Sequence, residues 1–196
     1  SVRSVVKLTL ANAGGQAVWL AATPIITRLY SPSNFGILAS FLTLLTLINA
    51  ISSLRYELAI VVPEQDDEAI SLVWLSGLFV FVTASLTLVV TTIFSEDISS
   101  WLKTPLLESY LWILPTGVFF LGLYQIGNFW AIRLKQFDVL AKTKFWQSVF
   151  GVFVNFLSFP FGAGGLILGQ IVNQSSGFPF LFKKSPHVFT NWKLRV

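Results

Sequence analysis

Two arginines lie at the borders of long apolar runs, where a cation can meet an anionic group. Arg28 precedes a Ser-Pro-Ser turn, and Arg55 stands in the run Leu-Arg-Tyr-Glu that ends at Glu57. An arginine at such a border commonly extends to phospholipid headgroups, and we expect this for Arg28. For Arg55 two roles stay open. It is expected either to contact headgroups or to bind an anionic ligand, because Glu57 is two positions away and would not share its helical face.

Amide side chains form a second set of candidate binding residues. They recur at spacings of three and four, which place each group on one face of a helix. The candidates are Asn12, Gln16, Asn49, Gln125, Asn128, Asn155, Gln170 and Asn173. Each amide alone is expected to hold two helices together by a hydrogen bond worth ~0.6 kcal/mol. Together, five apolar segments with a polar face predict a hydrated cavity that suits a ligand rich in hydroxyl groups.

Residues suited to covalent or metal chemistry are scarce. The chain has no cysteine, its single histidine is His187 near the C-terminus, and no charged residue lies near the centre of an apolar run. Glu57 is the only acid placed where a membrane glycosyltransferase or acyltransferase would need one, and no loop is long enough for a catalytic domain. We therefore expect no catalytic residue, no metal, no cofactor and no nucleic-acid partner, and we expect the chain not to be an enzyme.

The composition indicates what kind of scaffold positions these residues. Of 196 residues, 54% are hydrophobic and 11% are charged, with a mean hydropathy of +0.73. A soluble domain carries roughly 25% charged residues. Runs of about 20 apolar residues can cross the hydrocarbon core as helices, whereas a β-barrel would show shorter alternating segments. The predicted fold is an all-α, polytopic membrane bundle.

Breaks in the apolar sequence predict about six membrane spans within a single lobe over residues 1–182. A polar tail is expected over residues 183–196. The uncharged stretch from Phe145 to Phe182 is too long for one span, and Pro160 with the following glycines predicts a turn inside it. The expected spans are 8–27, 35–54, 70–95, 109–132, 145–160 and 164–182.

The distribution of basic residues predicts the orientation of these spans. With a cytoplasmic N-terminus, eleven lysines and arginines fall in cytoplasmic segments, and Arg28 and Lys103 fall outside. Cytoplasmic segments of membrane proteins are enriched in such residues. The expected location is the bacterial inner membrane, with both termini cytoplasmic. This places Arg28 outside and Arg55 on the cytoplasmic side, with the basic loop 133–144 also cytoplasmic.

Two motifs resemble a known family. The run Pro24-Ile-Ile-Thr-Arg-Leu-Tyr-Ser-Pro-Ser-Asn-Phe-Gly36 is followed by Leu54-Arg-Tyr-Glu-Leu-Ala-Ile60. Together with an acidic turn after Pro63, they resemble the start of bacterial polysaccharide flippases of the O-antigen type. These proteins belong to the multidrug/oligosaccharidyl-lipid/polysaccharide exporter superfamily. The segment Gly164-Gly-Leu-Ile-Leu-Gly-Gln170 is also similar to that family, and the resemblance extends to about Phe182.

The resemblance implies two six-helix lobes around a central cavity, of which this chain would be the N-terminal half. It implies transport of an undecaprenyl-pyrophosphate-linked oligosaccharide repeat across the cytoplasmic membrane during O-antigen and lipopolysaccharide biosynthesis. By position, Arg55 would meet the pyrophosphate. The expected partners are the bilayer, the lipid-linked oligosaccharide, and a missing C-terminal lobe or a second copy.

Two alternatives stay open. The chain could be an inactive remnant or a structural half-lobe, because one lobe cannot enclose a cavity. It could also be a cation-coupled multidrug extruder. The drug-extruding branch carries an acid in its first span, whereas residues 8–27 contain Asn12 and Gln16 and no carboxylate.

Overall fold

The computed structural model describes residues 2–177 and residue 181, and every regular element in that part of the chain is helical. The elements, in chain order, are α1 (Val2–Leu29), α2 (Pro32–Ile51), α3 (Tyr56–Ala59), α4 (Asp66–Ile93), α5 (Ser95–Trp101), η1 (Pro105–Ile113), α6 (Leu114–Arg133), α7 (Phe137–Leu157), η2 (Phe159–Phe161) and α8 (Ala163–Ser175).

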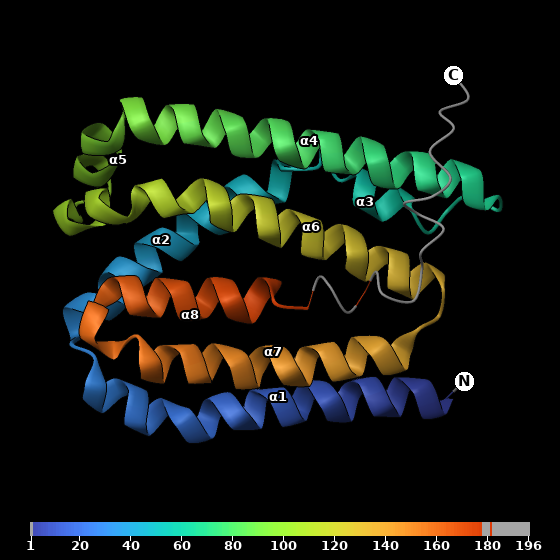
Figure 1. Cartoon of the computed structure of the whole chain (residues 1–196), viewed down its shortest axis with the longest axis horizontal. Helices are drawn as coiled ribbons and strands as arrows, with labels where there is room; N and C mark the ends of the chain where they lie inside the picture. Colours follow the sequence, from blue (N-terminus) through green and yellow to red (C-terminus); the bar gives the residue numbers. More distant parts are fainter. Residues whose placement is uncertain (1, 178–180, 182–196) are drawn as a thin grey trace.

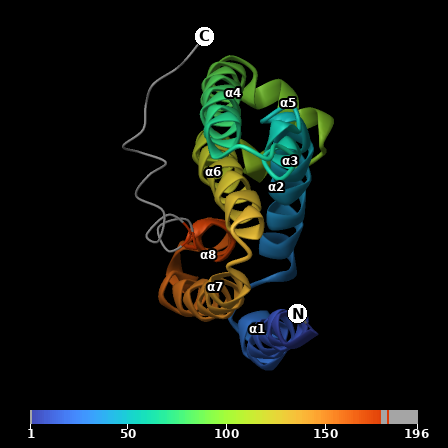
Figure 2. The ribbon, with the colours of Figure 1, turned by 90° about the vertical axis from the view of Figure 1, so that its right-hand side faces the viewer.

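The long helices form two groups that lie side by side (Figure 1). Helix α7 packs between α1 and α8, and α4 packs along α6. Seen from the end, α1, α7 and α8 form one group and α2, α4 and α6 form the other (Figure 2). Contacts of α8 with α2 and α6 join the groups. This arrangement leaves α1 as an edge helix that packs mainly on α7.

Apolar side chains from both groups form the core. The main cluster joins Phe41 and Leu45 of α2 with Leu111 of η1, Val118 of α6 and Ile167 of α8. All five side chains are essentially inaccessible to solvent. Burying each such side chain is worth about 1.5–3 kcal/mol. A second cluster, which includes Ile60 directly after α3 and Val80 of α4, holds α3 and α4 against α6.

The outer surface of the bundle is also apolar. Along α4, Leu78, Phe81 and Leu86 are all more than half exposed. Large exposed apolar surfaces of this kind fit hydrocarbon and not water. Within the described residues, three helical stretches are long and apolar enough to cross a membrane, namely Pro32–Ile51, Asp66–Ile93 and Pro105–Arg133. The predicted fold class is confirmed, and the chain is an all-α, multi-pass membrane protein.

Each expected span overlaps a helix of the described residues, although the bounds differ and the end of the last expected span lies outside them. Helix α1 extends beyond 8–27 at both ends, and α7 begins at Phe137 and not near 145. Lys142 and Lys144 therefore lie within a helix, where the sequence indicated a loop. The turn expected near Pro160 lies between α7 and α8, and Gly162 takes a φ of 57° there. The division into six spans stays a prediction, and the tail 183–196 lies outside the described residues.

Two turns place the arginines at different ends. Ser31 accepts a hydrogen bond from the backbone N–H of Asn34, and Pro32 starts α2, so the chain reverses directly after Arg28. After α2, Leu54 and Arg55 take φ values of 47° and 64°. Two consecutive left-handed residues break the helix and lead into α3, at a cost of about 1–2 kcal/mol each. Helix α3 lies toward the end of the bundle that carries the N-terminus (Figure 1).

Candidate functional site

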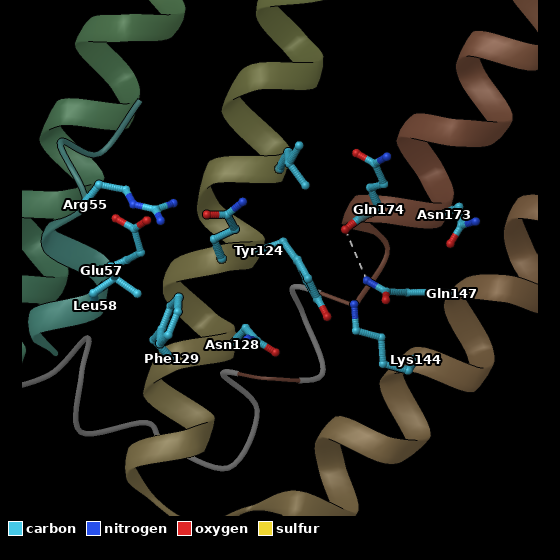
Figure 3. Close-up of a pocket in the computed structure, with 12 residues that line it drawn as sticks. Arg55, Glu57, Leu58, Tyr124, Asn128, Phe129, Lys144, Gln147, Asn173 and Gln174 are labelled. Carbon is cyan, nitrogen blue, oxygen red and sulfur yellow. Dashed lines mark hydrogen bonds between the residues drawn. The ribbon is translucent and has the colours of Figure 1, made fainter. Parts of the chain in front are cut away.

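A cavity of about 440 Å³ opens between α3, α6, α7 and α8, and we call it the Arg55 cavity. Figure 3 shows Arg55 and Glu57 on one side, Lys144 and Gln147 on the other, and Tyr124 and Asn128 between them. Its lining residues are Arg55, Glu57, Leu58, Leu121, Tyr124, Gln125, Asn128, Phe129, Lys144, Gln147, Asn173 and Gln174. Two cations and five amides make this lining polar.

Arg55 stands at the start of α3, and its side chain is exposed to the cavity. Among the described residues, no carboxylate forms an ion pair with its guanidinium. The ion pair at this end of the bundle joins Arg133 and Asp66 instead. A guanidinium presents fixed N–H donors that match the oxygens of a phosphate group. Arg55 is therefore free to bind an anion that enters the cavity.

Glu57 is the one carboxylate that lines the Arg55 cavity, and its side chain is almost fully buried. It accepts a short hydrogen bond from the hydroxyl of Ser53. The carbonyl of the neighbouring Ser52 accepts a hydrogen bond of 3.0 Å from Thr83 of α4. These contacts fix the turn that carries Arg55, because a buried carboxylate left without a donor would destabilise the fold.

Lys144 supplies the second cation, from the opposite wall. Its ammonium nitrogen lies 5.0 Å from the centre of the Tyr124 ring, within the range of a cation–π contact. One turn further along α7, the Gln147 amide donates a hydrogen bond of 3.2 Å to the carbonyl of Gln174 (Figure 3). Lys144 and Arg55 thus face the same hollow from α7 and α3.

Arg133, at the end of α6, holds the wall that carries α3. Its guanidinium donates to the carbonyls of Pro63 at 2.5 Å and Ile60 at 3.2 Å, and to Asp66 at 2.9 Å. The Arg133 side chain is 10% exposed, whereas that of Asp66 is 74% exposed. The carbonyl contacts are therefore the more protected part of this clamp between α6 and the segment leading into α4.

The structure brings four of the nine predicted binding residues together. Arg55, Gln125, Asn128 and Asn173 line the Arg55 cavity. Gln16 lines a separate groove against α1, which Asn173 also borders. Gln170 is partly buried and borders neither hollow, and the side chain of Asn12 lies outside the described part.

Asn49 is buried near the end of α2, and Asn155 is buried where α7 meets α8. The backbone carbonyl and side-chain oxygen of Asn49 accept the Ser52 hydroxyl at 3.0 and 3.3 Å. The backbone carbonyl of Asn155 accepts the Tyr30 hydroxyl at 2.7 Å, which ties the turn after α1 to α7. A side chain at Gly169 would collide with the Asn155 amide, so α7 and α8 touch directly at this point.

Sequence reasoning missed Lys144 and Tyr124 as cavity residues. Lys144 was counted as a loop charge because the helix start at Phe137 was not recognised. Its spacing of three from Gln147 could have placed it on the polar face of α7. Tyr124 directly precedes Gln125. Tyrosine is common in and near apolar spans, so no pattern in the sequence marks it as a cavity residue. Among the described residues, no cluster of acids and histidines could hold a metal ion.

A comparison with protein families now identifies the chain. Residues 25–195 match the family described as "Polysaccharide biosynthesis protein". The chain belongs to this polysaccharide biosynthesis family. The match begins inside the motif around Arg28 and covers the whole Arg55 cavity, so the resemblance found from the motifs is confirmed at the level of the family.

Membership of the polysaccharide biosynthesis family agrees with an apolar helical bundle that borders an open, polar and cationic cavity. No curated protein and no solved structure matches the chain significantly. The family description connects the chain with polysaccharide synthesis or export.

Proposed function

We propose that the chain translocates a lipid-linked oligosaccharide, carried on undecaprenyl pyrophosphate, across the bacterial inner membrane. The observation that carries this proposal is the Arg55 cavity, where two cations and several amides face one hollow inside an apolar bundle. A pyrophosphate needs cations, sugar hydroxyls need amides, and a polyprenyl chain needs an apolar surface. Cations, amides and an apolar surface all occur at the Arg55 cavity of this family member.

In the proposed mechanism, Arg55 attracts the pyrophosphate at the cytoplasmic mouth. The amides of Gln125, Asn128 and Asn173 bond sugar hydroxyls, while the lipid chain stays in the bilayer alongside. No covalent bond changes, so the activity is transport and not enzymatic. The proposed orientation has both termini in the cytoplasm. A second lobe, on a longer chain or in a second copy, would complete the cavity.

The charges of the lining favour an anionic substrate over a cationic drug. Arg55 and Lys144 outnumber Glu57, the one acid that borders the Arg55 cavity. Helix α1 contains no aspartate or glutamate that could couple export to a cation. A cationic drug would meet like charge in the cavity, which is unfavourable in a low-dielectric site.

The test is complementation of a bacterial strain that lacks its O-antigen flippase, with surface glycan as the readout. The chain alone and a version extended by a second lobe are compared. Restoration by the extended version alone supports a half-transporter, and restoration by the short chain would overturn the need for another lobe. If neither version restores glycan, the proposal of flipping is contradicted, and an inactive remnant is the better account.

Arg55→Ala and Arg28→Ala form a matched pair in the complementing version. Both remove one exposed guanidinium next to an apolar helix, yet only Arg55 lines the cavity. We expect Arg55→Ala to lower surface glycan at least about tenfold, as loss of a charge-assisted contact of ~1.5–3 kcal/mol implies. Arg28→Ala should keep most of it. Normal glycan with Arg55→Ala would show that Arg55 does not hold the pyrophosphate.

A further inference from the structure

A second hollow adjoins the Arg55 cavity, and its residues on α1 have no role in the function proposed above. This hollow, the α1 groove, has a volume of about 550 Å³ and lies between α1, α7 and α8. Its lining includes Gln16 and Trp19 of α1, Lys144 and Ser148 of α7, and Asn173 of α8. Lys144 and Asn173 border both hollows, so the two form adjoining parts of one polar surface.

The α1 groove combines an aromatic ring with uncharged polar groups. Trp19 is partly exposed, and its buried indole N–H has no acceptor in the described part of the chain. The Gln16 amide is exposed beside it. The C–H groups of a sugar ring pack well on an indole face, while an amide bonds the ring hydroxyls.

Close packing of α1 on α7 gives the groove its floor. A Cβ atom at Gly15 would lie 2.7 Å from the Ser148 hydroxyl, so the two helices approach tightly there. The hydroxyls of Ser148 and Thr23 donate to the carbonyls of Lys144 and Trp19, at 3.2 and 2.8 Å. Both hydroxyls already donate hydrogen bonds within their helices. Gln16, Lys144 and Asn173 are therefore the polar groups of the groove available to a ligand.

An acyl chain is a poor occupant of this groove. Apolar contact would remove water from the Gln16 amide and the Lys144 ammonium without giving either a partner, and unpaired buried polar groups are costly. A saccharide would give hydrogen bonds to both. Charge argues the same way, since no acid lines the groove and Lys144 adds a cation at the border with the Arg55 cavity.

We propose that the α1 groove holds the sugar directly attached to the diphosphate, and that Lys144, at the junction, contacts the phosphate that bears this sugar. The inference rests on the proposed function, because it assigns two parts of the same substrate to two hollows. Arg55 and Lys144 then bind the diphosphate from opposite walls, and Trp19 with Gln16 binds the first saccharide ring.

The test measures binding of two probes to the purified chain in lipid nanodiscs. The first probe is farnesyl diphosphate, and the second is farnesyl diphosphate esterified to N-acetylglucosamine. Lys144→Gln should weaken both probes about tenfold, because each contains the diphosphate. Trp19→Ala should weaken only the sugar-bearing probe, by about tenfold, since the ring contact is absent from the first probe.

Each variant has a control of the same residue type. Lys142 is exposed on α7 and borders neither hollow, so Lys142→Gln removes an equal charge and should leave both affinities unchanged. Trp101 is 89% exposed at the other end of the bundle, so Trp101→Ala should also bind normally. Gln16→Ala tests the groove without removing a packed ring, and it should weaken the sugar-bearing probe alone.

The outcomes separate the two proposals. If the unmodified chain binds neither probe, the proposed function fails and the groove assignment fails with it. If it binds both, but Trp19→Ala and Gln16→Ala change neither affinity or reduce both equally, the saccharide assignment is overturned and the function stands. If Lys144→Gln has no more effect than Lys142→Gln, the second phosphate contact is wrong.

Discussion

The contact between α7 and α8 and the Arg55 cavity use the same residue types for opposite purposes. At the contact, Asn155 and Ser158 face Gly169 and Gly165, and a side chain at either glycine would collide with α7. At the cavity, Asn128 and Gln125 face Lys144 and Gln147 across an open hollow. Amides alone therefore do not make a binding site.

The distance between the helices decides which role an amide takes. Small residues let helix backbones approach closely, as in many membrane bundles, and an amide at such a contact is covered by the partner helix. Next to the cavity, Tyr124 and Lys144 are large, and α3 is held away by its own turn. The space between them stays open to a ligand.

The largest expected loss of stability follows from adding a side chain at the closest point of the contact between α7 and α8. Gly169→Val would place two methyl groups where the Asn155 amide lies, so α7 and α8 would have to separate. We expect a loss of about 3 kcal/mol or failure to accumulate in the membrane, because overpacking a close contact forces backbone shifts. Thermal unfolding in detergent, followed by circular dichroism, measures the loss.

Gly77→Val is the matched control for that variant. Gly77 lies in the middle of α4, and a Cβ atom there would meet nothing within 4 Å. Its stability should change by less than about 0.5 kcal/mol, as for surface positions in general. Equal losses at Gly77 and Gly169 would contradict the view that α7 and α8 form a tight, dry contact.

The next effect concerns the support of the cavity wall. Arg133→Ala would leave the partly buried carbonyls of Ile60 and Pro63 without their donor, and we expect a loss of about 2 kcal/mol. Asp66→Ala removes only the exposed ion pair and should cost under about 1 kcal/mol. Thermal midpoints of the two variants give the comparison. If Asp66→Ala costs as much as Arg133→Ala, the ion pair and not the carbonyl contacts secures this wall.

The smallest effects are expected when one amide in each region is replaced by alanine. Asn155→Ala should lower stability by about 1 kcal/mol, because it leaves a gap in a packed contact, yet it should leave ligand binding unchanged. Asn128→Ala should keep stability and weaken a farnesyl diphosphate probe that carries an oligosaccharide about threefold, through loss of one hydrogen bond to a hydroxyl beyond the first sugar. Binding and unfolding are measured on the same preparations. Weakened binding in Asn155→Ala at normal stability would place the site elsewhere.

Much of the scaffold could be predicted from sequence because it depends on local properties. Continuous apolar runs require helices in a membrane, since the backbone must satisfy its own hydrogen bonds there. The turn after Arg28 could be expected from the Ser-Pro-Ser sequence, and the end of the next span could be expected because Arg55 interrupts an apolar segment. Arg55, Gln125, Asn128 and Asn173 could be selected as polar residues on helical faces.

The sites themselves depended on how the helices pack. Asn155 and Asn128 look equivalent in the sequence, but Gly169 covers the first and no helix covers the second. From the sequence, Lys144 is assigned to a charged loop. In the structure α7 already starts at Phe137, so Lys144 lies on a helix and contacts Tyr124. The sequence by itself determined the class of protein and its polar helical faces, because both follow from residue type and spacing. Only the tertiary structure decided which polar faces meet a neighbouring backbone and which meet open space, because separations between distant segments depend on packing.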